Sequence, residues 1–264
     1  MRAKLLATVA LTAVLASTAA CGGGHNAATT PGASSSAAGV SGPITVLAAA
    51  SLTESFKQIG TDFEAANPGA KITFSYGGSS GLAQQITSGA PADVFAAASP
   101  ATMKTVTDAG DAAGTPTTFV KNQLVIAVPK GNPKGITSLA ALAESGIKVA
   151  LCAEQVPCGT AAKKALAAAN IQVTPVTLEQ DVKAALSKVK LGEVDAALVY
   201  RTDAKAAASD VDGIEFPESA QAINNYPIVA LKNAPNAAGA AAFVAYVESA
   251  AAQRVLTDAG FQQP

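Results

Sequence analysis

Apolar residues along the chain follow two alternating patterns from about residue 44 onward. Short β-branched runs such as Ile-Thr-Val-Leu-Ala at 44–48 are typical of buried strands, whereas Leu52, Phe56 and Phe63 recur on one helical face. The pattern predicts strands over 44–48, 71–76, 93–97, 124–128, 147–151, 173–176, 196–200 and 226–231. It predicts helices over 52–66, 138–145, 160–169, 181–191 and 238–260, and a further helix after the glycine-rich turn at 77–81.

This alternation of strands and helices predicts an α/β protein with mainly parallel sheets flanked by helices. The strands are too many for one small core, so we expect two lobes, with the chain crossing near Asn122 and returning near Asn224. Lobe 1 then comprises 43–122 plus 225–264, and lobe 2 comprises 123–224. Ligands of such sheets bind beyond the carboxyl ends of the strands, where loops lead into helix N-termini.

The first twenty residues have the pattern of a secretory signal. A short basic start precedes an apolar run over 5–20 that is too short for a comfortable membrane span. The run ends Thr-Ala-Ala before Cys21, which resembles the bacterial lipoprotein box, so we predict a lipoprotein signal peptide over 1–20 and lipidation of Cys21. The alternative is an ordinary signal peptide followed by a chance cysteine. Residues 21–42, rich in Gly, Ala, Ser, Thr and Pro, predict a flexible tether at the outer face of the cell membrane.

Composition narrows the function classes. Charged residues make up 14% of the chain and the net charge is -1, so the chain offers no basic face to a nucleic acid and no polybasic membrane patch. The one histidine, His25, lies in a low-complexity stretch, so a Ser–His–Asp or Cys–His site on the folded part has no imidazole. A catalytic zinc site would also lack its commonest ligand. We therefore predict no catalytic residues, no enzyme activity and no cofactor.

Three strand-to-helix loops offer hydrogen-bond donors at the expected ligand edge. They are 48–51, which ends in Ser51, the Gly-Gly-Ser-Ser-Gly turn at 77–81, and Val-Pro-Cys-Gly-Thr at 156–160. Backbone N–H groups at a helix N-terminus favour an anion. A single serine in such a place is more often an ordinary cap, so the recurrence of these loops is what indicates an anion site. The turn is not a phosphate loop, because no lysine follows the glycines.

Several motifs in order carry a resemblance to a known family. They are Ala-Ala-Ala-Ser-Leu-Thr at 48–53, Gly-Ser-Ser-Gly-Leu-Ala-Gln-Gln-Ile at 78–86, Gly-Ala-Pro-Ala-Asp-Val-Phe at 89–95, Val-Pro-Cys-Gly at 156–159, Asp-Val at 181–182 and Ala-Leu-Val-Tyr at 197–200. With these motifs the chain from about 44 to 261 resembles the molybdate-binding receptors of bacterial ABC transporters. The resemblance implies a two-lobed periplasmic-binding-protein fold of type II, with the ligand in the cleft between the lobes.

The resemblance also implies which groups hold the ligand. In that family two serines, two backbone amides and a tyrosine hydroxyl hold the oxyanion. Matched motif by motif, these positions are Ser51, Ser79, Cys158, Val182 and Tyr200. Ser80 adjoins Ser79, so an exchange of roles between the two serines stays open, with Ser80 otherwise in a supporting position. Better-known relatives have a small aliphatic residue in place of Cys158, but the contact there is a main-chain N–H, so binding need not suffer.

The function that the resemblance implies is capture of molybdate or tungstate by a monomeric lipoprotein and delivery to an ABC permease, with no metal bound other than in the oxyanion. All the implied groups donate hydrogen bonds, which suits a fully deprotonated dianion, whereas the proton of hydrogen phosphate would lack an acceptor. Sulfate is not excluded by this argument, so a receptor for another tetrahedral oxyanion such as sulfate or thiosulfate is the alternative. A secreted hydrolase and an intracellular sensing domain are disfavoured by the missing histidine and by the leader.

The cysteines predict one further feature. Cys152 and Cys158 are the only cysteines besides Cys21, and an exported chain is disulfide-permissive. We expect a Cys152–Cys158 bridge, which would fix the loop that offers the Cys158 N–H. Two buried free thiols are the alternative.

Overall fold

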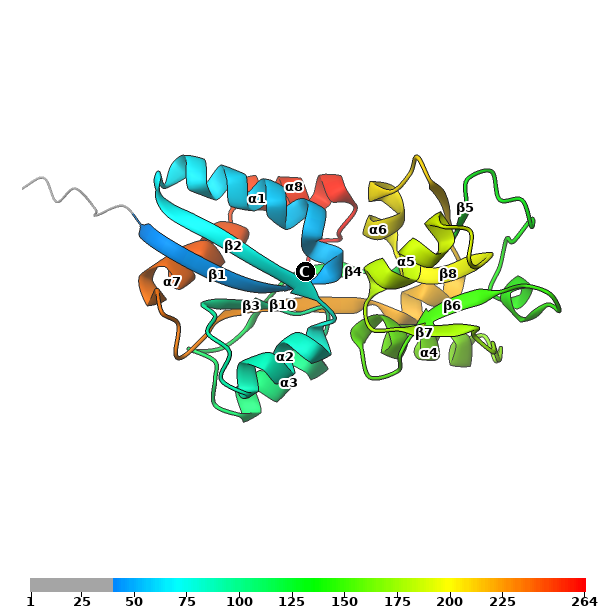
Figure 1. Ribbon diagram of the computed structural model, residues 1–264, viewed down its shortest axis with the longest axis horizontal. Coiled ribbons are helices and arrows are strands. Elements are labelled where there is room, and N and C mark those ends of the chain that lie inside the picture. The colour runs from blue at the N-terminus through cyan, green and yellow to red at the C-terminus, as the bar shows by residue number, and fades with distance from the viewer. Residues whose placement is uncertain (1–39) are drawn as a thin grey trace, which may run out of the picture. The chain divides into compact units, whose positions relative to one another are not determined.

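The computed structural model describes residues 40–264, which form two five-stranded sheets flanked by helices (Figure 1). The predicted signal peptide, the predicted lipidation site Cys21 and positions 22–39 of the predicted tether lie outside these residues. The strands are β1 (Ser41–Ala49), β2 (Gly69–Gly77), β3 (Val94–Ala96), β4 (Thr117–Asn122), β5 (Leu124–Pro129), β6 (Val149–Cys152), β7 (Thr177–Glu179), β8 (Ala196–Tyr200), β9 (Val211–Ile214) and β10 (Asn224–Ala230). The α-helices are α1 (Thr53–Ala66), α2 (Ser79–Thr87), α3 (Pro100–Asp108), α4 (Pro157–Ala168), α5 (Val182–Lys190), α6 (Arg201–Ala206), α7 (Ala237–Val247) and α8 (Ala250–Ala259). Three short 3-10 helices are η1 (Ala50–Leu52), η2 (Ala140–Ala143) and η3 (Pro217–Ala222).

The first sheet has the strand order β2-β1-β3-β10-β4. β1 pairs in parallel with β2 and with β3, whereas β10 is antiparallel to both of its neighbours. The second half of β1, residues 46–49, is fully buried, as expected for a parallel strand with both faces covered. Helices α1, α2, α3, α7 and α8 pack on this sheet or on one another (Figure 1). We call this sheet with these helices the first lobe.

The second sheet has the strand order β7-β6-β8-β5-β9. β6 is parallel to β7 and β8, and β5 is antiparallel to β8 and β9. Helices α4, α5 and α6 pack on it, and together they form the second lobe. In each sheet four strands therefore run in one direction, three of them paired in parallel, and the single antiparallel strand, β10 or β5, is the one that begins where the chain enters from the other lobe.

Two strand junctions carry the chain between the lobes. β4 ends at Asn122, and β5 begins at Leu124 after the single residue Gln123. The return leads from η3 into β10, where Asn224 lies opposite Asn122 in the antiparallel ladder. The two crossings thus run side by side, which is the arrangement of a hinge between two rigid bodies. The residue boundaries of the lobes stay a prediction, and β1 already begins at Ser41, inside the predicted tether.

The core of the first lobe is partly aromatic. Phe243 of α7 packs edge-on against Phe56 and Phe63 of α1, with ring centroids 6.1 and 5.4 Å apart. All three rings are fully buried. Edge-to-face pairs of this kind stabilise the fold by more than the burial of apolar area alone. They therefore fix the position of α1, the helix that follows η1.

The predicted strand over 173–176 is wrong in its position. The ladder with β6 instead uses Thr177, Leu178 and Glu179, opposite residues 150–152. Pro175 has no N–H for a ladder, which disfavours pairing through the earlier segment.

Two predicted helices also differ from the structure, and two helices of the structure, α3 and α6, were not predicted. The segment 238–260 is two helices, because Ser249 caps α8 by accepting a hydrogen bond from the Ala252 N–H, 3.4 Å away. The segment 138–145 contains only the short helix η2. The pattern missed α3, although Ser99 followed by Pro100 is the signature of a helix start. Within residues 40–264, no helix combines the length and apolarity needed to cross a membrane.

Candidate functional site

A small cavity lies between the two lobes, at the carboxyl ends of β1, β2, β6 and β8. The five residues predicted to hold the ligand all line it. They are Ser51, Ser79, Cys158, Val182 and Tyr200, and each is at most 4% exposed. Ser51 and Ser79 come from the first lobe and the other three from the second. The structure therefore brings together groups that are up to 149 positions apart in the chain, as the difference between 51 and 200 gives.

The cavity is sized for a very small ligand. The space open to the centre of a water molecule is about 20 Å³. A sphere of that volume has a radius of about 1.7 Å, close to the distance at which the oxygens of one tetrahedral oxyanion lie from its central atom. Sites for drug-sized ligands are more than about ten times larger. In this arrangement of the lobes the cavity has room for a compact ion.

Residues at the N-termini of four helices line this cavity. Ser51 lies in η1, Ser79 is the first residue of α2, Cys158 is the second of α4 and Val182 is the first of α5. The residues that precede η1, α2 and α4 make no side-chain cap. Their first N–H groups are therefore available to a ligand, and the partial positive charge of each terminus favours an anion.

The fourth terminus is capped by an acidic side chain. Asp181 also lines the cavity, and its Oδ1 accepts a hydrogen bond from the Ala184 N–H at 3.0 Å. This leaves the Val182 N–H, at the first helical position, without a side-chain cap. The Asp181 carboxylate is thus a helix cap, and the cavity is not lined by donors alone.

The three hydroxyls of the cavity are backed by other polar groups. Ser79 Oγ accepts a hydrogen bond from the Ala98 N–H at 3.0 Å, and the Tyr200 oxygen accepts one from Asn224 Nδ2 at 3.0 Å. The Ser79 hydroxyl can donate its own hydrogen into the cavity, whereas the Tyr200 hydroxyl can donate either into the cavity or to the neighbouring Tyr226 hydroxyl. Ser51 Oγ lies 2.8 Å from the Tyr226 hydroxyl, and either oxygen can be the donor. Burial raises the pKa of Tyr200 well above its ordinary value, so its phenol stays a proton donor.

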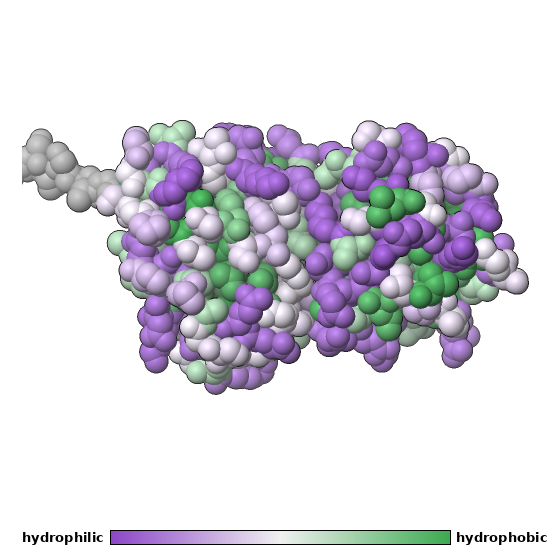
Figure 2. Space-filling view, viewed as in Figure 1, coloured by the Kyte–Doolittle hydropathy of each residue, from purple (hydrophilic) through white to green (hydrophobic). Residues whose placement is uncertain are grey.

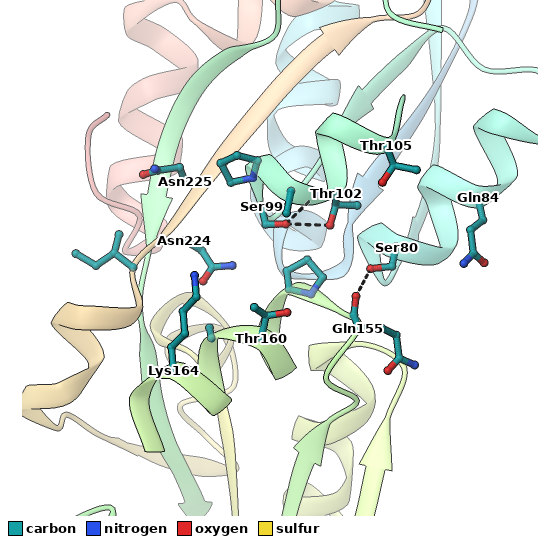
Figure 3. Close-up of a pocket in the computed structure, with 15 residues that line it drawn as sticks. Ser80, Gln84, Ser99, Thr102, Thr105, Gln155, Thr160, Lys164, Asn224 and Asn225 are labelled. Carbon is teal, nitrogen blue, oxygen red and sulfur yellow. Dashed lines mark hydrogen bonds between the residues drawn. The ribbon is translucent and has the colours of Figure 1, made fainter. Parts of the chain in front are cut away.

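Ser80 has a different role from Ser79. Its Oγ donates a 2.6 Å hydrogen bond to the Gln155 carbonyl oxygen, which belongs to the second lobe. The bond borders a larger cleft of about 560 Å³, in which Ser99, Thr160 and Lys164 also point inward (Figure 3). Since its hydrogen is used across the cleft and it does not line the small cavity, Ser80 joins the lobes beside the site.

Two more contacts join the lobes around the cavity. Gly78 lies against the Gln180 carbonyl oxygen so closely that a Cβ at this position would overlap it. Lys183 Nζ, in the second lobe, pairs with Glu54 of the first at 2.7 Å. Figure 2 shows hydrophilic side chains gathered along the line where the lobes meet on this face. The structure is therefore in a form in which the lobes enclose the site.

Comparisons with known proteins agree with this geometry. The family described as bacterial extracellular solute-binding protein matches residues 44–262. The chain belongs to that family. It is 45% identical to a molybdate-binding protein of Mycobacterium tuberculosis, over 88% of this chain and 92% of that one. It is 33% identical to a molybdate-binding protein of Haemophilus influenzae, over 84% and 90%.

Solved structures of this kind share the two-lobed fold. The periplasmic molybdate-binding protein of Azotobacter vinelandii has a TM-score of 0.72 at 22% identity, covering 84% of this chain and 99% of its own. The sulfate-binding protein SubI of Mycobacterium tuberculosis has a TM-score of 0.71 at 19% identity, covering 84% and 86%. These likenesses establish the periplasmic-binding-protein fold of the solute-binding protein.

Sequence reasoning missed the residues behind the hydroxyls. Asn224, Tyr226 and Ala98 belong to no motif, and their role depends on where β10 and β3 place them. Asp93, in contrast, is buried for structural reasons, since its carboxylate accepts hydrogen bonds from the Thr45 and Asn236 N–H groups, both at 2.6 Å. Within residues 40–264 no cluster of three or more His, Cys, Asp or Glu side chains could hold a metal ion.

The ion pair between the lobes extends to a buried carboxylate of the solute-binding protein. Lys183 Nζ also lies 3.1 Å from Oδ1 of Asp203, which is fully buried in α6. Burial raises the pKa of Asp203 to about 6, although the nearby Lys183 ammonium opposes the shift. The pKa of Lys183 is itself raised, because Asp203 and Glu54 outweigh its own partial burial.

We expect Asp203→Asn to remove a pH-dependent contribution to stability. Because the folded pKa is above the ordinary 3.8, the protonated carboxyl stabilises the fold at low pH, and this contribution is lost as the pH rises through about 6. The stability of the wild type relative to the variant should therefore fall between pH 4 and pH 7, by at most about 3 kcal/mol. Urea unfolding of the ligand-free proteins across this range measures it. The exposed Asp108→Asn is the matched control, and an equal pH trend in both variants would contradict the assignment.

The Cys152–Cys158 bridge is present in the structure, with the two Cα atoms 5.7 Å apart. It joins the end of β6 to the first turn of α4, and Gly159 next to it leaves no room for a Cβ against the Ala153 carbonyl oxygen. The bridge therefore holds a tightly folded loop at one of the donor-bearing helix N-termini.

Replacing both Cys152 and Cys158 by Ala should lower the free energy of unfolding by about 2 kcal/mol, the chain-entropy value for so short a loop. Reduction should lower the stability of the wild type by a similar amount and leave the double variant unchanged. Labelling of Cys152 or Cys158 by a thiol reagent in the unreduced, denatured wild type would show instead that these two cysteines are free.

Proposed function

We propose that this solute-binding protein captures molybdate or tungstate outside the cytoplasm and delivers it to an ABC permease. The observation that carries the proposal is the convergence of Ser51, Ser79, Cys158, Val182 and Tyr200 on one cavity of oxyanion size. The 45% identity to a molybdate-binding protein supports the choice of ligand. The family of solute-binding proteins supports a role in transport rather than in catalysis.

The donors explain how the ion would be held. The hydroxyls of Ser79 and Tyr200 each accept a hydrogen bond from behind, so their own hydrogens can be donated to the ligand. The N–H groups of Cys158 and Val182 lie at helix N-termini and add two further donors. Molybdate is fully deprotonated at neutral pH and can only accept. The Ser79 and Tyr200 hydroxyls and the two N–H groups offer no acceptor to the proton of hydrogen phosphate, and a buried proton without a partner costs about 1–3 kcal/mol. The Asp181 carboxylate also lines the cavity, but it already accepts a hydrogen bond as a helix cap.

Capture and closure are one event on this proposal. The first lobe supplies two of the five groups and the second supplies three, so the coordination shell is complete only when the lobes meet. A permease that recognises the closed form would then distinguish loaded from unloaded receptor. Lipidation at Cys21 would anchor the receptor to the outer face of the cell membrane, and the segment after it would let the lobes reach the permease.

Calorimetric titration of the mature chain with molybdate, tungstate, sulfate and phosphate tests the ligand. We expect one-to-one binding of the first two and much weaker binding of phosphate. Tyr200→Phe and Ser51→Ala should each weaken molybdate binding by about 10- to 100-fold, since each removes one buried hydrogen bond to a charged group. Tyr246→Phe, on α7 in the first lobe, is the matched control. Heat from sulfate and silence from molybdate would keep the receptor role but reject the ligand.

Gly78→Ala should specifically block closure. The new Cβ would overlap the Gln180 carbonyl of the other lobe, and relieving such overlaps costs about 1–3 kcal/mol, so we expect molybdate affinity to fall about 5- to 150-fold. Gly81→Ala, in the first turn of the helix that follows Gly78, meets nothing within 4 Å and is the matched control. Small-angle scattering with and without molybdate should show compaction of the control but not of Gly78→Ala. Equal affinity of the two variants would mean that the lobes do not meet here when the ion binds.

A further inference from the structure

Asn224 lies in the hinge between the two lobes. It is the first residue of β10, where the chain returns to the first lobe, and it lies opposite Asn122 of the outgoing crossing. Its side chain is only 8% exposed. A buried side-chain amide needs hydrogen-bond partners. The partners of Asn224 therefore show which parts of the two lobes are connected at the hinge.

The amide of Asn224 joins the two lobes. Its Nδ2 donates to the Ala98 carbonyl oxygen of the first lobe at 2.6 Å and to the Tyr200 oxygen of the second at 3.0 Å. The carbonyl can only accept, so it fixes which end of the amide carries the hydrogens. Both hydrogens are then committed, one to each lobe. The Tyr200 oxygen must therefore be the acceptor of its bond, and its own hydrogen must be directed elsewhere.

Ala98 links the Asn224 side chain to Ser79, a second residue predicted to hold the ligand. While its carbonyl oxygen accepts from Asn224, its N–H donates to Ser79 Oγ at 3.0 Å. The hydroxyls of Ser79 and Tyr200, which come from different lobes, are thus linked through Ala98 and Asn224. Each accepts a hydrogen bond from this link, so each can turn its own hydrogen toward the cavity, although for Tyr200 the Tyr226 hydroxyl is a second acceptor.

We propose that Asn224 is a positioning residue that fixes the Tyr200 hydroxyl as a donor to the bound oxyanion and thereby increases the preference of the site for fully deprotonated ions over protonated ones. The proposal rests on the proposed function and names a specificity determinant for the same site. Without the Asn224 amide, the Tyr200 hydroxyl is free to rotate. Its oxygen can then accept a hydrogen bond from a protonated ion, which the native arrangement forbids.

A double-mutant cycle on molybdate binding tests this role. Asn224→Ala should weaken binding about tenfold in the wild-type background and less than about threefold in the Tyr200→Phe background, because the amide acts through the phenol. Asn225→Ala, next to it in β10, is the control and should lose a similar small factor in both backgrounds. Losses by Asn224→Ala that multiply independently of Tyr200→Phe would overturn the proposal.

Selectivity gives a readout that a merely structural role would not move. The ratio of molybdate to phosphate affinity at pH 7 should fall by more than about tenfold in Asn224→Ala and stay constant in Asn225→Ala. If Asn224→Ala fails to fold, Asn224→Ser is measured in its place, and an unchanged ratio in the folded variant would overturn the proposal. Should the wild type bind sulfate rather than molybdate, the proposed ligand fails, and the same cycle with sulfate still decides the role of Asn224. A wild type that binds none of these oxyanions would overturn both.

Discussion

A dianion that leaves water for a closed cavity needs a complete set of hydrogen-bond donors, and no single loop of this chain can supply one. Each strand-to-helix turn offers one or two N–H groups and at most one hydroxyl inward. In this fold, residues at four helix N-termini from two separate lobes line one cavity. Neutral donors spread over helix ends stabilise the ion by dipoles, without a facing lysine or arginine whose own desolvation would cost free energy.

The position of that point follows from the topology. In each sheet three parallel strands end at the same edge, so the loops that follow them gather there. The antiparallel strands β5 and β10 link the sheets through the paired residues Asn122 and Asn224. Because the crossings are short and adjacent, the two edges face each other. The Cys152–Cys158 bridge and the aromatic core of the first lobe then keep the individual donors in place while the lobes move.

The sequence predicted the parts of the fold that depend on local pattern. Apolar periodicity located β1, β8 and α5 to within a few residues, and motif resemblance selected Ser51, Ser79 and Tyr200, which line one cavity. The motif did not decide whether Ser79 or Ser80 faces the ligand. The difference depends on the hydrogen bond of Ser80 to Gln155 across the cleft, which the sequence does not show. Asn224, Lys183 and Asp203 were missed for the same reason. Their partners lie in other elements of the fold, so no local pattern in the sequence points to them.

The Lys183–Glu54 pair has a consequence for the surroundings in which the receptor works. It spans the two lobes beside the site, and its side chains are 25% and 52% exposed, so dissolved ions can screen it. Its attraction adds to closure in dilute media and fades as the ionic strength rises. A receptor facing the outside of a cell meets whatever salinity the habitat provides. The lobes therefore close more readily around the anion in a habitat of low salinity than in one of high salinity.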